Sequence, residues 1–402
     1  MINHDLSAFQ IVFKRVSPTA DLSRFRHLFV LISIIFLSVG STFAQISVGL
    51  LTKESVSGIL IAPNEGKYLL KSEAGDTLYK FRSDDAVSIE ALGDNLVLKS
   101  VYGLTDTLQS IAVIGTGTNA SIYMRIGSEI KQHIYFETVN ITAKQGLLNL
   151  VNNLNLDRYV SLVVQAEVGS GAADEYYKIQ SIICRTYAMR NLERHATDGY
   201  DLCDHEHCQV FSGIKPPTNA VIKATAATSG YVMVGSENEL ILSAFHANCG
   251  GQTSNSEDVW RESRSYLTSV IDTFCLEARS SRWSKSLPLD EFLSQAGLPI
   301  EQEKYAGKTF NQPNRKKYFV VETDSVETSK MRRYLGLRST FFDITIKDNE
   351  VEMTGRGYGH GVGLCQQGAM KMAESGYTYS QILGYYYKGV SLVPINSLQP
   401  EK

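Results

Sequence analysis

The sequence has no marked excess of charge of either sign. Its 402 residues include 39 Lys and Arg against 42 Asp and Glu, and the formal net charge is -3. The chain therefore lacks both the basic surface that binds nucleic acid and a long acidic tail. We expect no nucleic-acid partner, and any other partner has to be inferred from local sites.

Beyond residue 45 the sequence also lacks an apolar run long enough to cross a bilayer. The N-terminus differs, because basic residues precede an apolar run over residues 28–37 and small residues then lead to Ala44. This order is typical of a secretory signal, so we expect cleavage after Ala44 and a signal peptide over residues 1–44. The alternative is an uncleaved membrane anchor. Both place the protein in the periplasm or outside the cell, with membrane contact only through an uncleaved N-terminal segment. The basic residues are Lys14, Arg15, Arg24 and Arg26.

Residues 46–132 contain no His, Cys or Trp, the residue types that most often carry chemistry. Short apolar runs alternate there with Gly, Asn and Asp, which predicts antiparallel strands. Helical spacing begins near residue 148, over residues 156–167 and 176–187. A strand at 240–245, a polar and poorly periodic insert at about 275–335, a strand at 341–346 and a final helix from about 367 to 376 follow. We predict an α+β fold with a β-rich domain at 45–145 and a mixed helix and antiparallel-sheet domain with a substrate groove at 146–396.

Glu167 lies in phase with the apolar residues of the first predicted helix, so its side chain is expected to face the protein or a cleft. Burial removes hydration from a carboxylate, and the pKa should rise. A carboxylic acid that is protonated near neutral pH can act as a general acid at a glycosidic oxygen. The ordinary alternative is a last-turn Glu that reaches solvent or pairs with Arg185, and the helix pattern alone favours that alternative.

Two glycine-containing segments place polar side chains where backbone can approach a ligand. Residues 245–253 combine His, Asn and Thr with two glycines, and residues 355–369 alternate five glycines with Arg, Tyr and His. The second segment lacks the Lys and Ser or Thr of a phosphate-binding P-loop. Each segment alone could be an ordinary turn with a structural His, but the presence of two favours a binding groove.

A third cluster combines Cys and His at short spacing. His195, Cys203, His207 and Cys208 could chelate zinc, with His205 as a substitute ligand. Four protein ligands would close the site, so the zinc would be structural. The alternative is a Cys203–Cys208 disulfide, which an oxidising compartment permits. The sequence does not decide between the two.

These segments, in this order, resemble the SpoIID/LytB family, named for the stage II sporulation protein D and the amidase enhancer. The resemblance covers about residues 148–393. One departure is Val168-Gly169 after Glu167, where the family often has Met-Pro. Five motifs carry the resemblance: Val-Val-x-x-Glu at 163–167, Ser-x-x-x-Arg-Thr-Tyr-Ala at 181–188, Cys-Gln-Val-Phe-x-Gly at 208–213, His-x-Asn-Cys-Gly-Gly-x-Thr at 246–253, and Gly-x-Gly-His-Gly-Val-Gly-x-x-Gln-x-Gly-Ala at 357–369.

The resemblance implies a peptidoglycan lytic transglycosylase that cleaves the MurNAc–GlcNAc bond of peptide-stripped glycan strands and leaves 1,6-anhydroMurNAc ends. The family's catalytic Glu falls on Glu167, and some members carry a Cys/His zinc site at the position of the third cluster. A glycoside hydrolase normally needs two carboxylates, whereas this reaction needs one, and no motif here supplies a second. Residues expected to bind the saccharide are Arg185, Gln209, His246, Asn248, Thr253, Tyr358, His360 and Gln366.

Three other functions compete with the lyase. The first is a non-catalytic module that binds glycan and stimulates an N-acetylmuramoyl-L-alanine amidase. The second is a zinc hydrolase that uses the Cys/His cluster. The third is an exported structural protein, which would account for the signal segment but not for the ordered motifs.

Overall fold

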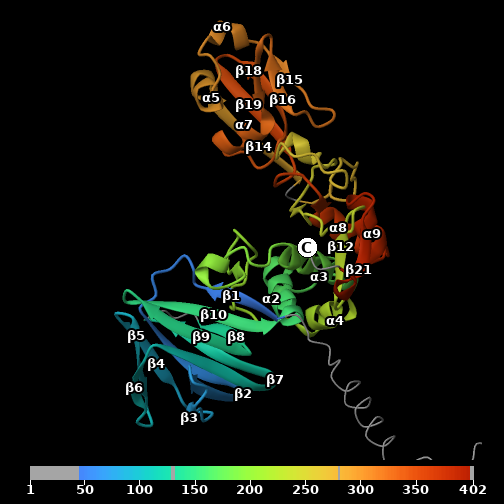
Figure 1. The fold of residues 1–402 in the computed structure, drawn as a ribbon. Coiled ribbons are helices and arrows are strands. Elements are labelled where there is room, and N and C mark those ends of the chain that lie inside the picture. Colours follow the sequence, from blue (N-terminus) through green and yellow to red (C-terminus); the bar gives the residue numbers. More distant parts are fainter. Residues whose placement is uncertain (1–44, 128–131, 279–280, 399–402) are drawn as a thin grey trace, which may run out of the picture. The chain divides into compact units, whose positions relative to one another are not determined.

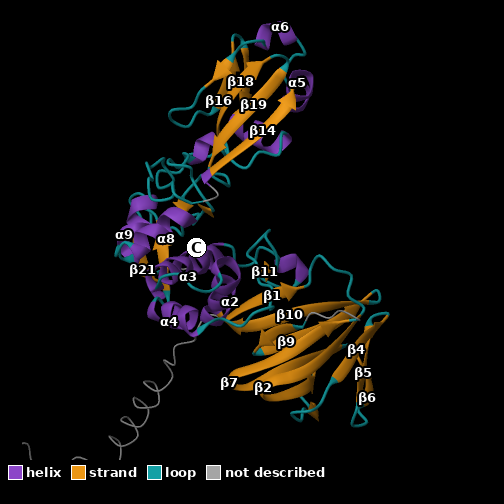
Figure 2. Cartoon of the chain, turned by 180° about the vertical axis from the view of Figure 1, so that it is seen from behind, coloured by secondary structure: helices purple, strands orange, loops and turns teal. Residues whose placement is uncertain are grey.

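The computed structural model describes residues 45–127, 132–278 and 281–398 (Figure 1). The predicted signal peptide, residues 1–44, lies outside the described residues. The described chain is α+β, as the sequence predicts (Figure 2). Over those same residues, no helix is long and apolar enough to cross a membrane.

The strand-rich region forms a sheet that contains eleven strands among the described residues. Its path runs β11-β1-β10-β9-β7-β2-β4-β5-β6, with β3 paired to β2 and β8 paired to β7. Alternating residues of the strands are buried, as a sheet with one covered face requires. The strands are β1 (Gln45–Leu50), β2 (Gly58–Ser72), β3 (Thr77–Lys80), β4 (Val87–Leu92), β5 (Asn95–Ser100), β6 (Thr105–Leu108), β7 (Ser110–Ile126), β8 (His133–Phe136), β9 (Thr138–Lys144), β10 (Leu147–Asn155) and β11 (Leu202–Cys203).

The predicted boundary at residue 145 falls in the turn between β9 and β10, which pair with each other. The sheet therefore continues to Asn155, whose side chain caps the next helix by accepting from the Asp157 amide. The short strand β11 comes from far along the chain and pairs in parallel with β1. The sheet is thus joined to the segment that carries the Cys/His cluster.

The two predicted helices are confirmed as α2 (Leu156–Val168) and α3 (Asp174–Arg190). They pack with α4 (Asn219–Ala227), and α3 also contacts α8 (Gln366–Glu374) and α9 (Tyr379–Tyr386). The predicted last helix is therefore α8, and the sequence reasoning missed α9 after it. Short 3-10 turns occur at Ala196–Asp198, Ser256–Asp258 and Ile395–Ser397.

The strand predicted at residues 240–245 is wrong over most of its length. Only β13 (Phe245–His246) forms there, paired in parallel with β20 (Leu364–Cys365). Just before β13, the Ala244 carbonyl accepts a hydrogen bond from the Leu364 amide that is not part of a strand ladder. The apolar residues of this segment therefore pack into the protein without forming a continuous strand. The nearby β12 (Tyr231–Val234) pairs instead with β21 (Ser391–Pro394).

The insert described as polar and poorly periodic has its own apolar core. One sheet has the order β14-β19-β18-β15, and β16 and β17 form a hairpin. The periodic residues Leu289, Phe292, Leu293 and Ala296 are buried, a helical signal that the sequence reasoning missed. The elements are β14 (Arg282–Pro288), α5 (Leu289–Ala296), α6 (Gln302–Tyr305), β15 (Thr309–Phe310), β16 (Tyr318–Val321), β17 (Asp324–Glu327), α7 (Thr328–Tyr334), β18 (Phe341–Lys347) and β19 (Glu350–Arg356).

Candidate functional site

Glu167 lies in the last turn of α2, which ends at Gly169 with φ 75°. Its side chain is partly buried, and its carboxylate accepts a hydrogen bond from the Val210 backbone amide. Burial raises the pKa of the Glu167 carboxyl above its ordinary value, and the Val210 amide offsets part of that rise. The rise in pKa expected from the sequence is therefore confirmed.

Buried polar groups surround this carboxyl on the protein side. The Tyr159 hydroxyl donates to Gln209 Oε1 at 3.1 Å, and both residues are buried. Gln209 also hydrogen-bonds the Cys184 thiol. Burial raises the pKa of the Cys184 thiol, and the nearby Glu167 charge raises it further. Glu167, Cys184 and Gln209 thus form one group of neighbouring polar side chains, from α2, α3 and the segment after Cys208. We call the surroundings of this group the Glu167 pocket.

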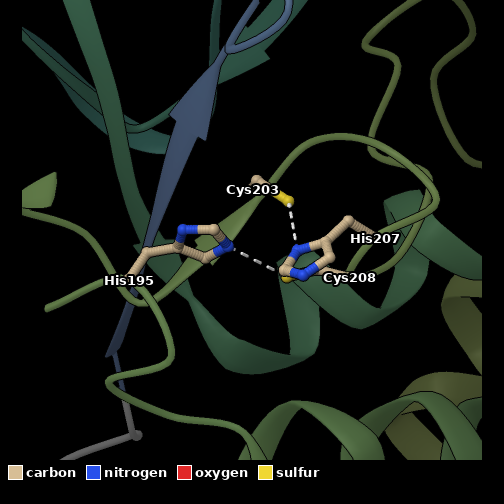
Figure 3. A group of neighbouring side chains, drawn as sticks. All are labelled: His195, Cys203, His207 and Cys208. Carbon is tan, nitrogen blue, oxygen red and sulfur yellow. Dashed lines mark hydrogen bonds between the residues drawn. The ribbon is translucent and has the colours of Figure 1, made fainter.

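The Cys/His cluster lies on the chain just before that segment. Side-chain ligand atoms of His195, Cys203, His207 and Cys208 all lie within 4.8 Å of one another (Figure 3). Cys203 Sγ is 3.6 Å from His207 Nδ1, and Cys208 Sγ is 3.6 Å from His195 Nε2. The structure therefore brings together the four residues that the sequence favoured, while His205 instead accepts from the His207 amide.

The donor set and its spacing fit zinc. With bonds of about 2.3 Å to sulfur and about 2.1 Å to nitrogen, the S–N edge of a tetrahedral site is about 3.6 Å. His195 Nδ1 lies 2.9 Å from Asp198 Oδ2 and its Nε2 faces the sulfurs. Carboxylates commonly orient metal-bound His residues by hydrogen-bonding the other ring nitrogen in this way. Cys203 and Cys208 are both free thiols in the structure. Four protein ligands leave no open position, so the arrangement suits a structural ion.

Arg185 is placed where it cannot bind a saccharide, which corrects the sequence prediction. Its side chain is 0% exposed, and its Nη2 and Nε atoms donate to Asp157 Oδ1 at 2.7 and 3.0 Å. Further donors reach the carbonyls of Thr225 and Tyr231. The guanidinium thus joins α2, α3, α4 and β12, and it pairs with Asp157 rather than with Glu167.

Asn248 and Thr253 are also internal, which corrects two further assignments. The Asn248 amide donates to the Cys275 carbonyl at 3.1 Å, and its Oδ1 accepts from the Gly250 amide at 2.7 Å. Thr253 Oγ1 accepts from the Val270 amide at 2.8 Å. Because these groups are buried and hydrogen-bonded within the protein, they shape the loop instead of contacting a ligand.

His246 and His360 form a second polar region. Their ring centroids lie 5.5 Å apart, and the His360 ring is 4.9 Å from the Trp260 ring. Burial lowers the pKa of His246 well below its usual range and the pKa of His360 to about 4, so both are neutral at pH 7. His360 Nδ1 accepts from the Val362 amide at 3.0 Å, which leaves its proton on Nε2.

His360 lines a cavity of about 440 Å³ together with side chains of α7 and of the loop at 259–261. Its polar residues are mostly basic and include Arg332 and Arg333. Glu167 is outside this lining, and Tyr358 is exposed. Gln366 is partly buried and hydrogen-bonds the Tyr176 hydroxyl on α3. Of the predicted binding residues, Gln209 lies in the polar group near Glu167, and His360 lines this cavity.

Comparison with known proteins finds a SpoIID segment in this chain. A family model described as "Stage II sporulation protein" matches residues 144–234, which include Glu167, Gln209 and the Cys/His cluster. Stage II sporulation protein D of Bacillus subtilis is 27% identical over 259 residues, which cover 60% of this chain and 75% of that protein. Residues 144–234 thus match the SpoIID family model, and the chain is similar to proteins of the SpoIID/LytB family.

Two further relatives differ in how much of each chain the alignment covers. An uncharacterized protein of Brachyspira hyodysenteriae is 28% identical over 369 residues, which cover 81% of this chain and 98% of that protein. The amidase enhancer of Bacillus subtilis is 27% identical over 286 residues, which cover 57% of this chain and 39% of that protein.

Three residues near the predicted sites were missed from the sequence. Tyr159 and Cys184 lie on apolar helix faces, where such residues are usually core, and nothing in the local pattern marks them. Trp260 could have been noticed, because the chain has only two Trp residues and an aromatic ring is a common platform for sugars.

Proposed function

We propose that this SpoIID/LytB protein is a peptidoglycan lytic transglycosylase that acts outside the cytoplasm in cell-wall remodelling. It cleaves the MurNAc–GlcNAc bond, on strands stripped of stem peptides, and leaves 1,6-anhydroMurNAc ends. The match to the SpoIID family model and the similarity to an amidase enhancer support the role at the cell wall. The observation that carries the enzymatic proposal is the half-buried carboxyl of Glu167. Burial raises its pKa, and it accepts a hydrogen bond from the Val210 amide.

The reaction uses Glu167 twice. Its protonated carboxyl donates to the bridging glycosidic oxygen as the bond from C1 to that oxygen breaks, and GlcNAc leaves with a hydroxyl. The ionised carboxylate then accepts the proton of the C6 hydroxyl of MurNAc, whose oxygen bonds to C1. Glu167 ends protonated as it began, and no water is consumed.

The electrostatics of Glu167 suit both halves of this cycle. Burial favours the protonated form, which the first half needs. The Val210 amide stabilises the carboxylate, which the second half produces. Neither influence is a second carboxylate, so the pocket resembles that of a lone acid and base more than that of a paired hydrolase.

Structural zinc at His195, Cys203, His207 and Cys208 is part of the proposal. Bound zinc would supply a cross-link and no chemistry at the glycosidic bond. Cys208 directly precedes Gln209 and Val210, the two residues that contact the Glu167 pocket. The four ligands would therefore hold the segment whose Val210 amide offsets part of the rise in the pKa of Glu167.

The decisive experiment incubates the full chain with denuded glycan strands and analyses the products by mass spectrometry. We expect anhydro-muramyl ends from the wild type and at least a 1000-fold lower rate from Glu167→Gln. Glu374→Gln is the matched control, because it removes one exposed carboxylate from α8. Undiminished anhydro product from a folded Glu167→Gln variant would refute the role of Glu167.

The second candidate is a non-catalytic stimulator of an N-acetylmuramoyl-L-alanine amidase. The similarity to a protein named amidase enhancer favours it. Under this function the chain binds glycan strands and raises amidase turnover, while no anhydro ends form at any protein concentration. Equal stimulation by wild type and Glu167→Gln, without anhydro product, would select it over the lyase.

A further inference from the structure

A second cluster of metal-ligating side chains lies in the interior, away from the Cys/His cluster. Sγ atoms of Cys249, Cys275 and Cys365 and a carboxylate oxygen of Asp272 all lie within 4.8 Å of one another, and all four residues are buried. Cys249 follows β13, Asp272 and Cys275 lie in the loop before the insert, and Cys365 ends β20. Residues far apart in sequence thus converge on one point.

The distances between these side-chain atoms fit an ion with tetrahedral coordination. Cys249 Sγ lies 3.4 Å from Cys275 Sγ and 3.2 Å from Asp272 Oδ2. With zinc bonds of about 2.3 Å to sulfur and about 2.1 Å to oxygen, the expected edges are about 3.8 and 3.6 Å. A disulfide would need the two sulfurs at about 2.05 Å. The observed separations are much closer to those of a ligand set than to that of a disulfide.

Backbone donors are aimed at these side chains, as a cluster of thiolates requires. Cys365 Sγ accepts from the Cys249 amide at 3.3 Å and from the Gly368 amide at 3.4 Å, at the N-terminus of α8. The amides of Gly250 and Gly251 donate to the Cys275 sulfur. Such N–H groups stabilise negative charge that would otherwise be costly in the interior.

Two side chains complete the surroundings. The Tyr386 hydroxyl donates to Asp272 Oδ2 at 2.9 Å, which orients the carboxylate from outside. Arg315 Nη2 donates to the Cys249 carbonyl at 2.7 Å, which places a cation beside the three sulfurs. Three thiolates and one carboxylate around a divalent ion carry net negative charge, and Arg315 offsets part of it.

We propose that Cys249, Asp272, Cys275 and Cys365 bind a second zinc ion. This site fastens the His246–Thr253 segment to the Gly-rich segment before α8. The bond from Asn248 to the Cys275 carbonyl also joins the His246–Thr253 segment to the loop that carries Asp272 and Cys275. The zinc fixes the spacing of β13 and β20, and with it the positions of His246 and His360. The proposal is independent of glycan cleavage.

The test measures the zinc content of the full chain by plasma mass spectrometry, after reconstitution with zinc alone and removal of free metal. We expect two zinc ions per chain in the wild type. The single variants Asp272→Ala and Cys365→Ser should each lose the ion of the second cluster and keep one, and His207→Ala should lose the ion of the Cys/His cluster and keep one. Cys184→Ser is the matched control, because Cys184 is a buried thiol outside both clusters, and it should retain two.

X-ray absorption on zinc-loaded His207→Ala reports the ligands of the remaining ion without altering the proposed site. Three sulfur neighbours and one oxygen at bonding distance would support the proposal. The proposal is overturned if the wild type holds a single zinc that His207→Ala removes. Peptide mapping that finds a Cys249–Cys275 disulfide in the reconstituted wild type would also overturn it. If the wild type holds a single zinc that Asp272→Ala loses and His207→Ala keeps, the result would support this site and contradict the proposed zinc at the Cys/His cluster.

Discussion

Replacing Arg185 with Met tests whether this residue is structural or binds substrate. The Met side chain keeps much of the length of Arg185 but removes the charge and all five donors. Asp157 then loses the partner of a 2.7 Å ion pair, and the carbonyls of Thr225 and Tyr231 each lose one donor. Breaking a buried ion pair costs about 3–5 kcal/mol, and because Asp157 is 26% exposed, we expect a loss of about 3 kcal/mol.

Urea unfolding followed by fluorescence measures this loss of unfolding free energy, and steady-state kinetics on denuded glycan strands measures function at a temperature where the variant is folded. We expect an unchanged KM, because Arg185 is 0% exposed. Arg282→Met is the matched control: this arginine is exposed on β14, and its loss should change stability by less than about 0.5 kcal/mol. Near-wild-type stability together with a tenfold higher KM would refute the structural role and restore the sequence prediction.

Three other predictions concern the two polar regions. Burial raises the pKa of Glu167 in the folded state above the value of 4.5 expected in the unfolded state. Between these two pKa values the unfolded chain has lost the proton that the folded chain still holds. The free energy of unfolding therefore falls as the pH rises through this interval. Glu167→Gln should therefore match the wild type in thermal midpoint below pH 4.5 and exceed it at pH 7; a variant less stable at pH 7 would contradict this sign. Chelation of zinc, or His207→Ala, should lower kcat at least tenfold, because the Gln209–Val210 segment would then no longer be held next to Glu167. Full turnover by the metal-free protein would show that the Cys/His cluster does not influence Glu167. Trp260→Ala should raise KM for glycan strands about tenfold and leave kcat within twofold, whereas unchanged KM would place the saccharide outside the His360 cavity.

Local sequence patterns were enough to predict some parts of the structure. The bounds of α2 and α3 follow from apolar residues at helical spacing, and the raised pKa of Glu167 follows from its phase on α2. The four residues of the Cys/His cluster lie within a stretch of fourteen residues in sequence, so their convergence required little tertiary information.

Other features depend on contacts that no local pattern encodes. Arg185 occupies the polar stripe of its helix, but Asp157, 28 residues earlier, turns that stripe into a buried junction. Asn248 was assigned to ligand binding because it lies between His246 and two glycines, and only the fold shows that its partners are Cys275 and Gln367. The second cysteine cluster was missed for the same reason, since Cys249 and Cys365 are 116 residues apart.

A lone carboxyl that acts as both acid and base needs a narrowly set environment. Greater burial would favour proton retention and slow the second half of the reaction, whereas greater exposure would lower the pKa and leave too little acid for the first. In this chain the Val210 amide acts against burial, and Val210 stands two residues after Cys208, a member of the Cys/His cluster. A cross-link at that cluster would therefore influence the proposed chemistry without touching the substrate, because it limits how far the Val210 amide can move from the Glu167 carboxylate.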